Sequence, residues 1–292
     1  MLRIFLLLPL SLALYLATAN SHAQAEDDRG YALGVGVSAD NADGFTAIAL
    51  ADVSFSEAAS LSASVGTTRA AARPEDLRTR EWSIGGRYDF GAVGIEARGG
   101  QSGDPDDFDA KDLMFGLFHQ GEQWRVSLQY LERDIDLVLR TSRSQQAFEF
   151  AVPLQAEGWR LATSYRTESR WRWYGQYRQF DYDRDLSPLS NRFIVERLTP
   201  TTLTLATSLL DDSLSVGMEV PLGGSKALNV AFARDTLAGD LGSVDSASFG
   251  MLVPVGQRGD LDINIGISQG DDNFGNDSTF YLNVLYLFYG LF

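Results

Sequence analysis

The feature that most constrains this chain is a period of two in hydrophobicity that recurs along most of its length. In Thr279–Phe292 every second residue from Phe280 is apolar or Gly. Successive side chains of a β-strand point to opposite faces, so this stretch predicts a strand with one apolar face. The same alternation, with polar or small residues between, is found in Tyr31–Val37, Trp82–Phe90, Trp124–Tyr130, Trp159–Tyr165, Leu214–Val220 and Leu261–Ile267. The pattern predicts an all-β protein.

The length of these segments favours a membrane-spanning sheet over a soluble one. They run about 8–12 residues, which matches the ~9–11 residues of a tilted membrane strand and exceeds the ~5–6 of a typical soluble strand. Beyond residue 25 no run of 18 apolar residues exists, so no spanning helix is expected. A buried strand of a soluble sandwich is the alternative for any one segment.

The expected connections between strands fall into two classes. Tight turns are predicted at Gly121-Glu122, Glu168–Arg170, Gly223–Ser225 and Gln257–Gly259. Longer acidic loops are predicted at Asp40–Gly44, Arg69–Arg80, Gln101–Lys111, Asp181–Ser190, Thr236–Asp245 and Gly270–Asp277. If the C-terminus is placed in the periplasm, the acidic loops fall with few exceptions on the opposite side. Short periplasmic turns and longer outer loops are typical of outer-membrane barrels, whereas a soluble sandwich gives no reason for such sorting.

The tryptophans provide an independent indication. Trp82, Trp124, Trp171 and Trp173 lie within about three residues of a predicted turn or loop, and Trp159 begins the alternating segment Trp159–Tyr165. Tryptophan prefers the boundary between lipid and water, where its ring is apolar and its N–H is hydrated. In a soluble core the same residues would more often lie in mid-strand.

The N-terminal segment predicts export. Residues 1–25 contain Arg3, an apolar run and the small-x-small ending Ala23-Gln24-Ala25, which is the pattern of a signal peptide. Residues 26–292 are expected to form a single barrel domain. Of 24 basic residues Arg3 is removed, so 23 remain against 39 acidic residues and the mature charge is -16. This acidity excludes nucleic acid as an expected partner, and the absence of Cys excludes a disulfide framework.

Together these features resemble a bacterial outer-membrane β-barrel of the porin-like kind. The resemblance implies a transmembrane antiparallel up-and-down barrel, for which we expect about 16 strands within a range of 14–18. The range in strand number comes from two stretches, Ile135–Val152 and Asn191–Leu198, whose pattern does not fix the number of strands. It also implies that the last strand is recognised by the barrel-assembly machinery, with Phe292, Phe288 and Tyr286 as the assembly signal. Gly290 departs from the apolar residue usual at its place.

The resemblance further implies a protein of the bacterial outer membrane that contacts membrane lipids and lipopolysaccharide. The oligomeric state stays open, with a homo-oligomer among the alternatives. No cofactor is expected.

The sequence offers little for catalysis or metal binding. His119, the one His beyond residue 25, shares parity with Leu113, Phe115 and Leu117, so we expect it on the lipid side with no Ser partner. Asp181–Asp185 begins like a calcium loop, but Leu186 and Arg192 stand where an EF-hand needs Gly and Glu. We therefore expect no enzyme, no catalytic residues and no metal site.

The residues predicted on the inner face of the barrel are the most informative about function. The parity opposite to the apolar one contains a run of arginines: Arg87, Arg98, Arg125, Arg140, Arg160, Arg166, Arg172 and Arg178. Four acids, Asp89, Glu96, Asp136 and Glu149, are expected on the same wall. From residue 202 onward this parity becomes small and neutral, with Thr202, Thr204, Ser208, Ser215, Gly217, Asn229, Ser246, Ser248, Asn264 and Ser268. The charges predict either a salt-bridge ladder that stiffens the wall or an electrostatic lining for polar or anionic solutes.

Two functions from different classes therefore remain. The first is a porin-like channel for passive diffusion of small polar or anionic solutes. The second is a non-conducting structural or receptor-type barrel that acts through acidic extracellular loops. Leu285 and Leu287 favour the second, because they place aliphatic bulk on the inward parity of the last strand.

Overall fold

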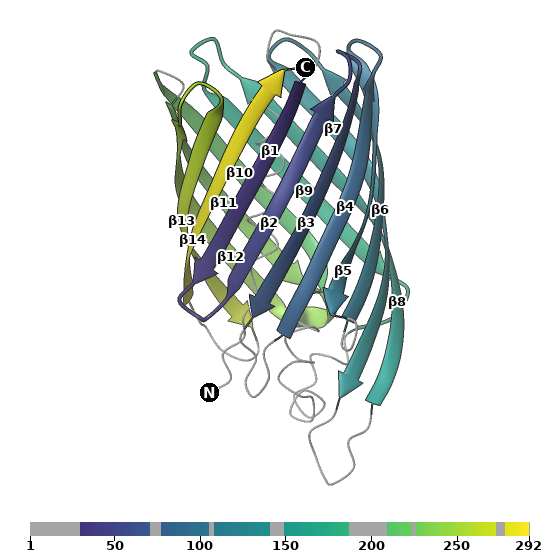
Figure 1. Cartoon of the computed structure of the whole chain (residues 1–292). Helices are drawn as coiled ribbons and strands as arrows, with labels where there is room; N and C mark the ends of the chain where they lie inside the picture. The colour runs from purple at the N-terminus through teal and green to yellow at the C-terminus, as the bar shows by residue number, and fades with distance from the viewer. Residues whose placement is uncertain are drawn as a thin grey trace.

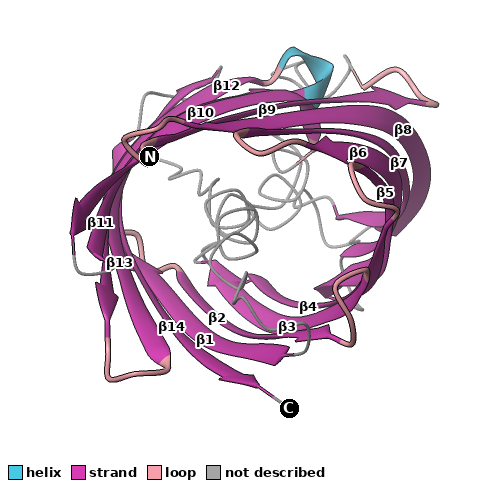
Figure 2. Cartoon of the chain, turned by 90° about the horizontal axis from the view of Figure 1, so that it is seen from above, coloured by secondary structure: helices cyan, strands magenta, loops and turns pink. Residues whose placement is uncertain are grey.

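The computed structural model describes residues 30–70, 77–104, 108–140, 149–186, 209–223, 226–272 and 278–291. These residues form one closed antiparallel barrel of fourteen strands (Figures 1 and 2). The strands are β1 Gly30–Asp40, β2 Phe45–Ser54, β3 Ala59–Ala70, β4 Leu77–Asp89, β5 Val93–Asp104, β6 Phe108–Gln120, β7 Trp124–Arg140, β8 Glu149–Arg166, β9 Arg172–Tyr182, β10 Leu210–Gly223, β11 Lys226–Leu237, β12 Gly242–Pro254, β13 Gly259–Asp272 and β14 Ser278–Leu291. No helix in the described ranges is long and apolar enough to cross a membrane.

The barrel closes by pairing its first strand with its last. Each strand pairs with its neighbours in sequence, and β1 pairs with β14 from Gly30↔Leu291 to Asp40↔Tyr281. In lipid every backbone N–H and C=O must find a partner within the protein, and a closed barrel achieves this because it has no edge strand. The all-β up-and-down fold is confirmed, and the strand count is the lower bound of the expected range.

The strand count is at the lower bound of the expected range because some strands are longer than expected. The uncertain stretch Ile135–Val152 holds the end of β7 and the start of β8, which pair along their whole described length from Trp124↔Tyr165 to Arg140↔Glu149. This hairpin projects beyond the others in Figure 1. The other uncertain stretch, Asn191–Leu198, lies outside the described residues. So do residues 1–29 and Phe292, and with them the predicted signal peptide and the end of the predicted assembly signal.

The outer surface of the barrel is apolar. Large apolar side chains at alternate positions are exposed on every strand, among them Leu33, Val35, Val37, Ile84, Phe115, Leu161, Phe232, Ile265 and Phe280. Exposure of such a large continuous apolar surface to water would be unfavourable, and the surface is suited to contact with lipid.

The outer face turns polar towards one end, and aromatic residues mark the change. On β7 the outward positions pass from Tyr130 to Glu132, and on β8 they pass from Trp159 to Glu157; all but the half-buried Tyr130 are exposed. The rings of Tyr130 and Trp159 meet edge to face with centroids 5.2 Å apart. On β4 Trp82 is the last apolar outward residue before Arg80. These residues form an aromatic boundary of the kind found at a membrane surface.

Connections alternate between the two ends of the barrel. The end that holds Gly30 and Leu291 (top of Figure 1) carries the turns at 55–58, 90–92, 121–123, 167–171 and 255–258, and is called here the tight-turn end. The other end is called the loop end. The predicted sorting is confirmed, but two predicted loops are wrong in extent. Most of Gln101–Lys111 and of Thr236–Asp245 belongs to strands β5, β6, β11 and β12.

These two loops were predicted too long because the alternation of apolar and polar residues shows where a strand contacts lipid. It does not show where the strand begins or ends. Beyond the apolar band the outer face meets water, so charged side chains are accepted there without a desolvation cost. The backbone ladder continues all the same, because it needs only a paired neighbour strand. Strand ends that project past the membrane are therefore acidic, and in the sequence they resemble loops.

Candidate functional site

The inner wall between β4 and β9 carries the predicted arginine cluster. Arg87, Arg98, Arg125, Arg160, Arg172 and Arg178 lie half-buried on strand faces opposite to the exposed apolar side chains. Arg166 has the same parity but is exposed at the tight-turn end of β8. Asp89 and Glu96 also lie on this face, whereas the side chain of Arg140 is outside the described part of the chain. Sequence parity therefore placed on the inner wall every member of the cluster that the structure describes.

Several of these arginines are neutralised by acids. Arg87 binds Asp89 through an ion pair of 2.9 Å and also donates a 3.0 Å hydrogen bond to Oε1 of Gln120. Nη2 of Arg125 lies 3.7 Å from Oε2 of Glu96. Arg172 lies directly across from Glu219 in the β9–β10 register. These contacts support the salt-bridge ladder that the sequence suggested.

Three arginines of the cluster form no ion pair within the described residues, although Asp52 and Glu96 lie within electrostatic range of Arg98, and Asp235 within that of Arg178. Arg98 shows neither hydrogen bond nor ion pair there. Arg160 donates from Nη2 to Oε1 of Gln176, which is a neutral acceptor. Arg178 stacks on the ring of Phe180 with its guanidinium carbon 5.5 Å from the ring centre. Nε of Arg160 and Nε of Arg178 are both buried without a hydrogen-bond partner. We call Arg98, Arg160 and Arg178 the unpaired triad.

The register aligns part of the cluster into one transverse row across β4 to β11. The residues that lie opposite one another across successive strands are Arg87, Glu96, Gly116, Gln129, Arg160, Arg178, Ser213 and Asp235. Opposed residues of an antiparallel pair share a face, so all these side chains reach the same inner surface. Nε2 of Gln129 donates to Oε1 of Glu96 at 2.5 Å, which joins two members of the row.

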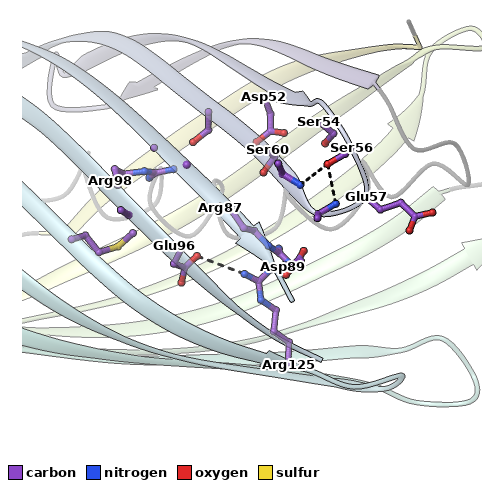
Figure 3. A pocket seen from close by; sticks show the side chains of 17 residues that line it. Asp52, Ser54, Ser56, Glu57, Ser60, Arg87, Asp89, Glu96, Arg98 and Arg125 are labelled. Atoms are coloured by element: carbon purple, nitrogen blue, oxygen red, sulfur yellow. Dashed lines mark hydrogen bonds and ion pairs between the residues drawn. The ribbon is translucent and has the colours of Figure 1, made fainter. Parts of the chain in front are cut away.

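A cavity of about 170 Å³ opens on this wall beside the row. Its lining includes Arg87, Arg98 and Arg125 together with Asp52 and Glu96 (Figure 3). Asp52 comes from β2, whereas Glu96 lies on β5 beside Arg98, so acids line the cavity both beside the arginines and across from them. A cavity of mixed charge with several polar groups can accept polar solutes and gives no advantage to apolar ones.

Sequence reasoning missed one inward arginine and one aromatic residue that supports the cluster. Arg133 on β7 binds Asp112 through both carboxylate oxygens, at 2.5 Å and 3.1 Å. Phe118 on β6 lies under Arg87 and Arg125, with guanidinium-to-ring distances of 4.1 Å and 4.8 Å. Planar guanidinium groups stack on aromatic faces, and this restricts their motion. Continuing the parity of Arg125 along β7 would have indicated Arg133.

Two expectations about the remaining acids were wrong. Asp136 is exposed and lies on the outer parity, because β7 continues without a bulge from the inward Arg125. The wall from β10 to β13 is also less neutral than predicted, since Glu219, Asp235 and Asp262 lie on its inner face. The expected small residues Ser215, Gly217, Asn229, Ser246, Ser248, Asn264 and Ser268 do lie there, whereas Thr202, Thr204 and Ser208 fall outside the described residues, as does the side chain of Glu149.

The strands that close the barrel carry an inward aliphatic patch. Leu285 and Ile48 flank Gly36, and Leu287 and Leu50 flank Gly34, in two adjacent rows. A Cβ at Gly34 would lie 2.7 Å from the nearest atom of Leu50 and 2.9 Å from that of Leu287, so the neighbouring side chains close over the glycines. The inward placement of Leu285 and Leu287 is therefore confirmed.

Neither catalysis nor metal binding gains support from side-chain placement. His119 lies on the outer parity, and its ring is 4.6 Å from that of Trp124. No group of three or more His, Cys, Asp or Glu suited to a metal ion occurs in the described segments. On β14 Tyr286 and Phe288 both have the outer parity.

Comparison with known proteins agrees with this architecture. The sequence profile of Gram-negative porins matches residues 11–185. The fold is similar to the CymD monoaromatic hydrocarbon channel (TM-score 0.58, 10% identity, 92% of this chain and 90% of that one). It is also similar to the Pseudomonas putida toluene transporter TodX (TM-score 0.53, 9% identity, 92% and 90%) and to OmpT, an outer membrane protein of Vibrio cholerae (TM-score 0.51, 8% identity, 89% and 96%). No curated protein sequence matches.

Proposed function

The chain belongs to the Gram-negative porin family, and from the charges of its inner wall we propose that it is a channel through which small polar or anionic solutes diffuse passively. The observation that carries this proposal is the unpaired triad. Guanidinium groups that form no ion pair within the described residues make the inner wall between β5 and β9 locally electropositive. A purely structural ladder would pair each arginine with an acid.

The distribution of charge supports selectivity at the wall despite the acidity of the whole chain. Acids at the loop end act only over a Debye length of ~8–10 Å. The triad lies on the wall itself, from the middle of β5 to the middle of β9. A solute passing along β5 to β9 would therefore respond to these arginines more strongly than to distant acids.

A non-conducting barrel is the second candidate, and the aliphatic patch around Gly34 and Gly36 favours it. Purified protein in a planar lipid bilayer separates the two functions. Stepwise current increments in potassium chloride are expected for the channel. Correctly folded protein that inserts and gives no increments would overturn the channel and leave the receptor-type barrel.

A further inference from the structure

Two buried charges of opposite sign lie unsatisfied in the transverse row. Arg178 on β9, Ser213 on β10 and Asp235 on β11 are successive members of it. Nε of Arg178 and Oδ1 of Asp235 are both buried, and neither has a hydrogen-bond partner in the described part of the chain. A buried polar atom without a hydrogen-bond partner destabilises the fold, and more so in a charged group, so these two atoms call for a partner.

The two side chains lie close enough to feel each other without forming an ion pair. Arg178 and Asp235 are mutually within electrostatic range, yet no ion pair of 4.0 Å or less joins them in the described structure. Ser213 stands between them and hydrogen-bonds to the Asp235 carboxylate. Because neighbouring strands are ~4.8 Å apart, the backbones that carry the two charges are separated by about 10 Å.

Neighbouring residues make the site more selective. Arg160 lies directly opposite Arg178 and has a second buried Nε without a partner. One side of Ser213 is thus doubly cationic and the other side is anionic. An ion with only a negative charge would be attracted by the arginines but repelled by Asp235. An ion with only a positive charge would be attracted by Asp235 but repelled by the arginines.

We propose that Arg160, Arg178 and Asp235 form a binding station for a small zwitterion of the α-amino-acid type. The carboxylate of the solute accepts hydrogen bonds from the two arginines, and its ammonium group donates to Asp235. Both charged groups of an α-amino acid are attached to one carbon atom, so they can face two side chains whose backbones are about 10 Å apart. The station deepens the proposed function, on which it rests, by naming a class of polar solute.

The station lies near the loop end of the lipid band. The exposed outward residues beside it change from apolar to polar there, from Tyr177 to Gln179 on β9 and from Phe232 to Arg234 on β11. A solute entering from the loop end would meet the station before it reaches Arg87 and Arg125, which lie near the tight-turn end of their strands.

The test compares glycine with probes that carry only one of its charges. Single-channel chloride current is recorded while glycine, acetate or methylammonium is added. Glycine is expected to reduce the current at a concentration at least tenfold lower than either single-charge probe. Asp235→Asn and Arg178→Gln should each raise the half-effect concentration for glycine at least tenfold, because each removes one charged hydrogen-bonding group.

Matched controls use inward charges away from the station. Asp262→Asn and Arg166→Gln should leave the glycine effect unchanged, and the electrophoretic heat shift of each variant reports folding. Equal potency of glycine, acetate and methylammonium would overturn the station and leave water as the occupant of the gap.

The station and the channel can fail separately. If the unmodified protein carries no current, the proposed channel is wrong. Equilibrium binding of labelled glycine to the purified protein then tests the station alone, and absence of saturable binding that depends on Asp235 overturns it.

Discussion

Replacing Arg98, Arg160 and Arg178 together by Gln should abolish anion preference in the channel. These residues are the members of the cluster that form no ion pair in the described structure. Changing Arg125 or Arg172 is a poorer test. Glu96 lies beside Arg125 and Glu219 lies across from Arg172, so either change would leave the charge of a carboxylate uncompensated.

The expected size of the effect follows from the number of unpaired charges. Unit charges ~4 Å apart interact by roughly 1–4 kcal/mol at an effective dielectric of ~20–80, and ion pairs such as Arg133 with Asp112 cancel beyond a few ångströms. We take a net advantage of about 1 kcal/mol for chloride over potassium, which corresponds to a permeability ratio of about 5. In a tenfold gradient of potassium chloride this ratio moves the reversal potential by about 30 mV towards that of chloride.

The reversal potential in a planar bilayer is the measurement. In the triple Gln variant it should move to zero or to the potassium side, since inward acids such as Asp52 remain. The control is the double variant Arg133→Gln with Asp112→Asn, which removes an ion pair without changing the net charge. Its reversal potential should equal that of the unmodified protein. A cation preference in the unmodified protein, or an unchanged potential in the triple variant, would refute the role of the triad.

Three further outcomes are expected. Phe292→Asp should reduce the yield of heat-modifiable barrel and leave unfolded periplasmic chain; a normal yield would exclude an assembly role for this residue. Arg184→Cys, at the loop end, should react with an impermeant thiol reagent on intact cells, whereas Gln257→Cys, in a tight turn, should not; the reverse result would invert the orientation. Gly158→Ala should lower stability in urea by about 1–3 kcal/mol, because a Cβ there would lie 2.3 Å from the carbonyl oxygen of Gln179. Gly270→Ala is the matched control, since its Cβ would meet nothing within 4 Å, and equal midpoints for the two variants would contradict the packing argument.

Much of the fold could be predicted because lipid and lumen impose opposite demands on alternate residues. The contrast between Trp159 and Arg160, adjacent in sequence and opposite in direction, is already visible in the sequence. The same alternation predicted the outward His119 and the inward Arg87, Arg98, Arg125, Arg172 and Arg178. A period of two needs no tertiary information, because it follows from the strand geometry itself.

The bounds of the strands could not be predicted in the same way. Outside the lipid band the outer face of β7 becomes acidic, with Glu132, Asp134 and Asp136 exposed in water. There the alternation of apolar and polar residues ends although the strand does not. The assignment of Asp136 to the inner wall failed at this point, and so did the predicted loops at Gln101–Lys111 and Thr236–Asp245.

Within the lipid band the sequence by itself determined which side chains reach the inner wall; only the tertiary structure decided where that band ends and which inward charges are neutralised. Parity assigns Arg87 and Arg178 to the same face but says nothing about their partners. Arg87 meets Asp89 on its own strand and Gln120 from β6, whereas Arg178 meets Phe180 and faces Asp235 across β10. Pairing depends on the register between strands, and register is fixed by the closure of the whole barrel, to which every strand contributes.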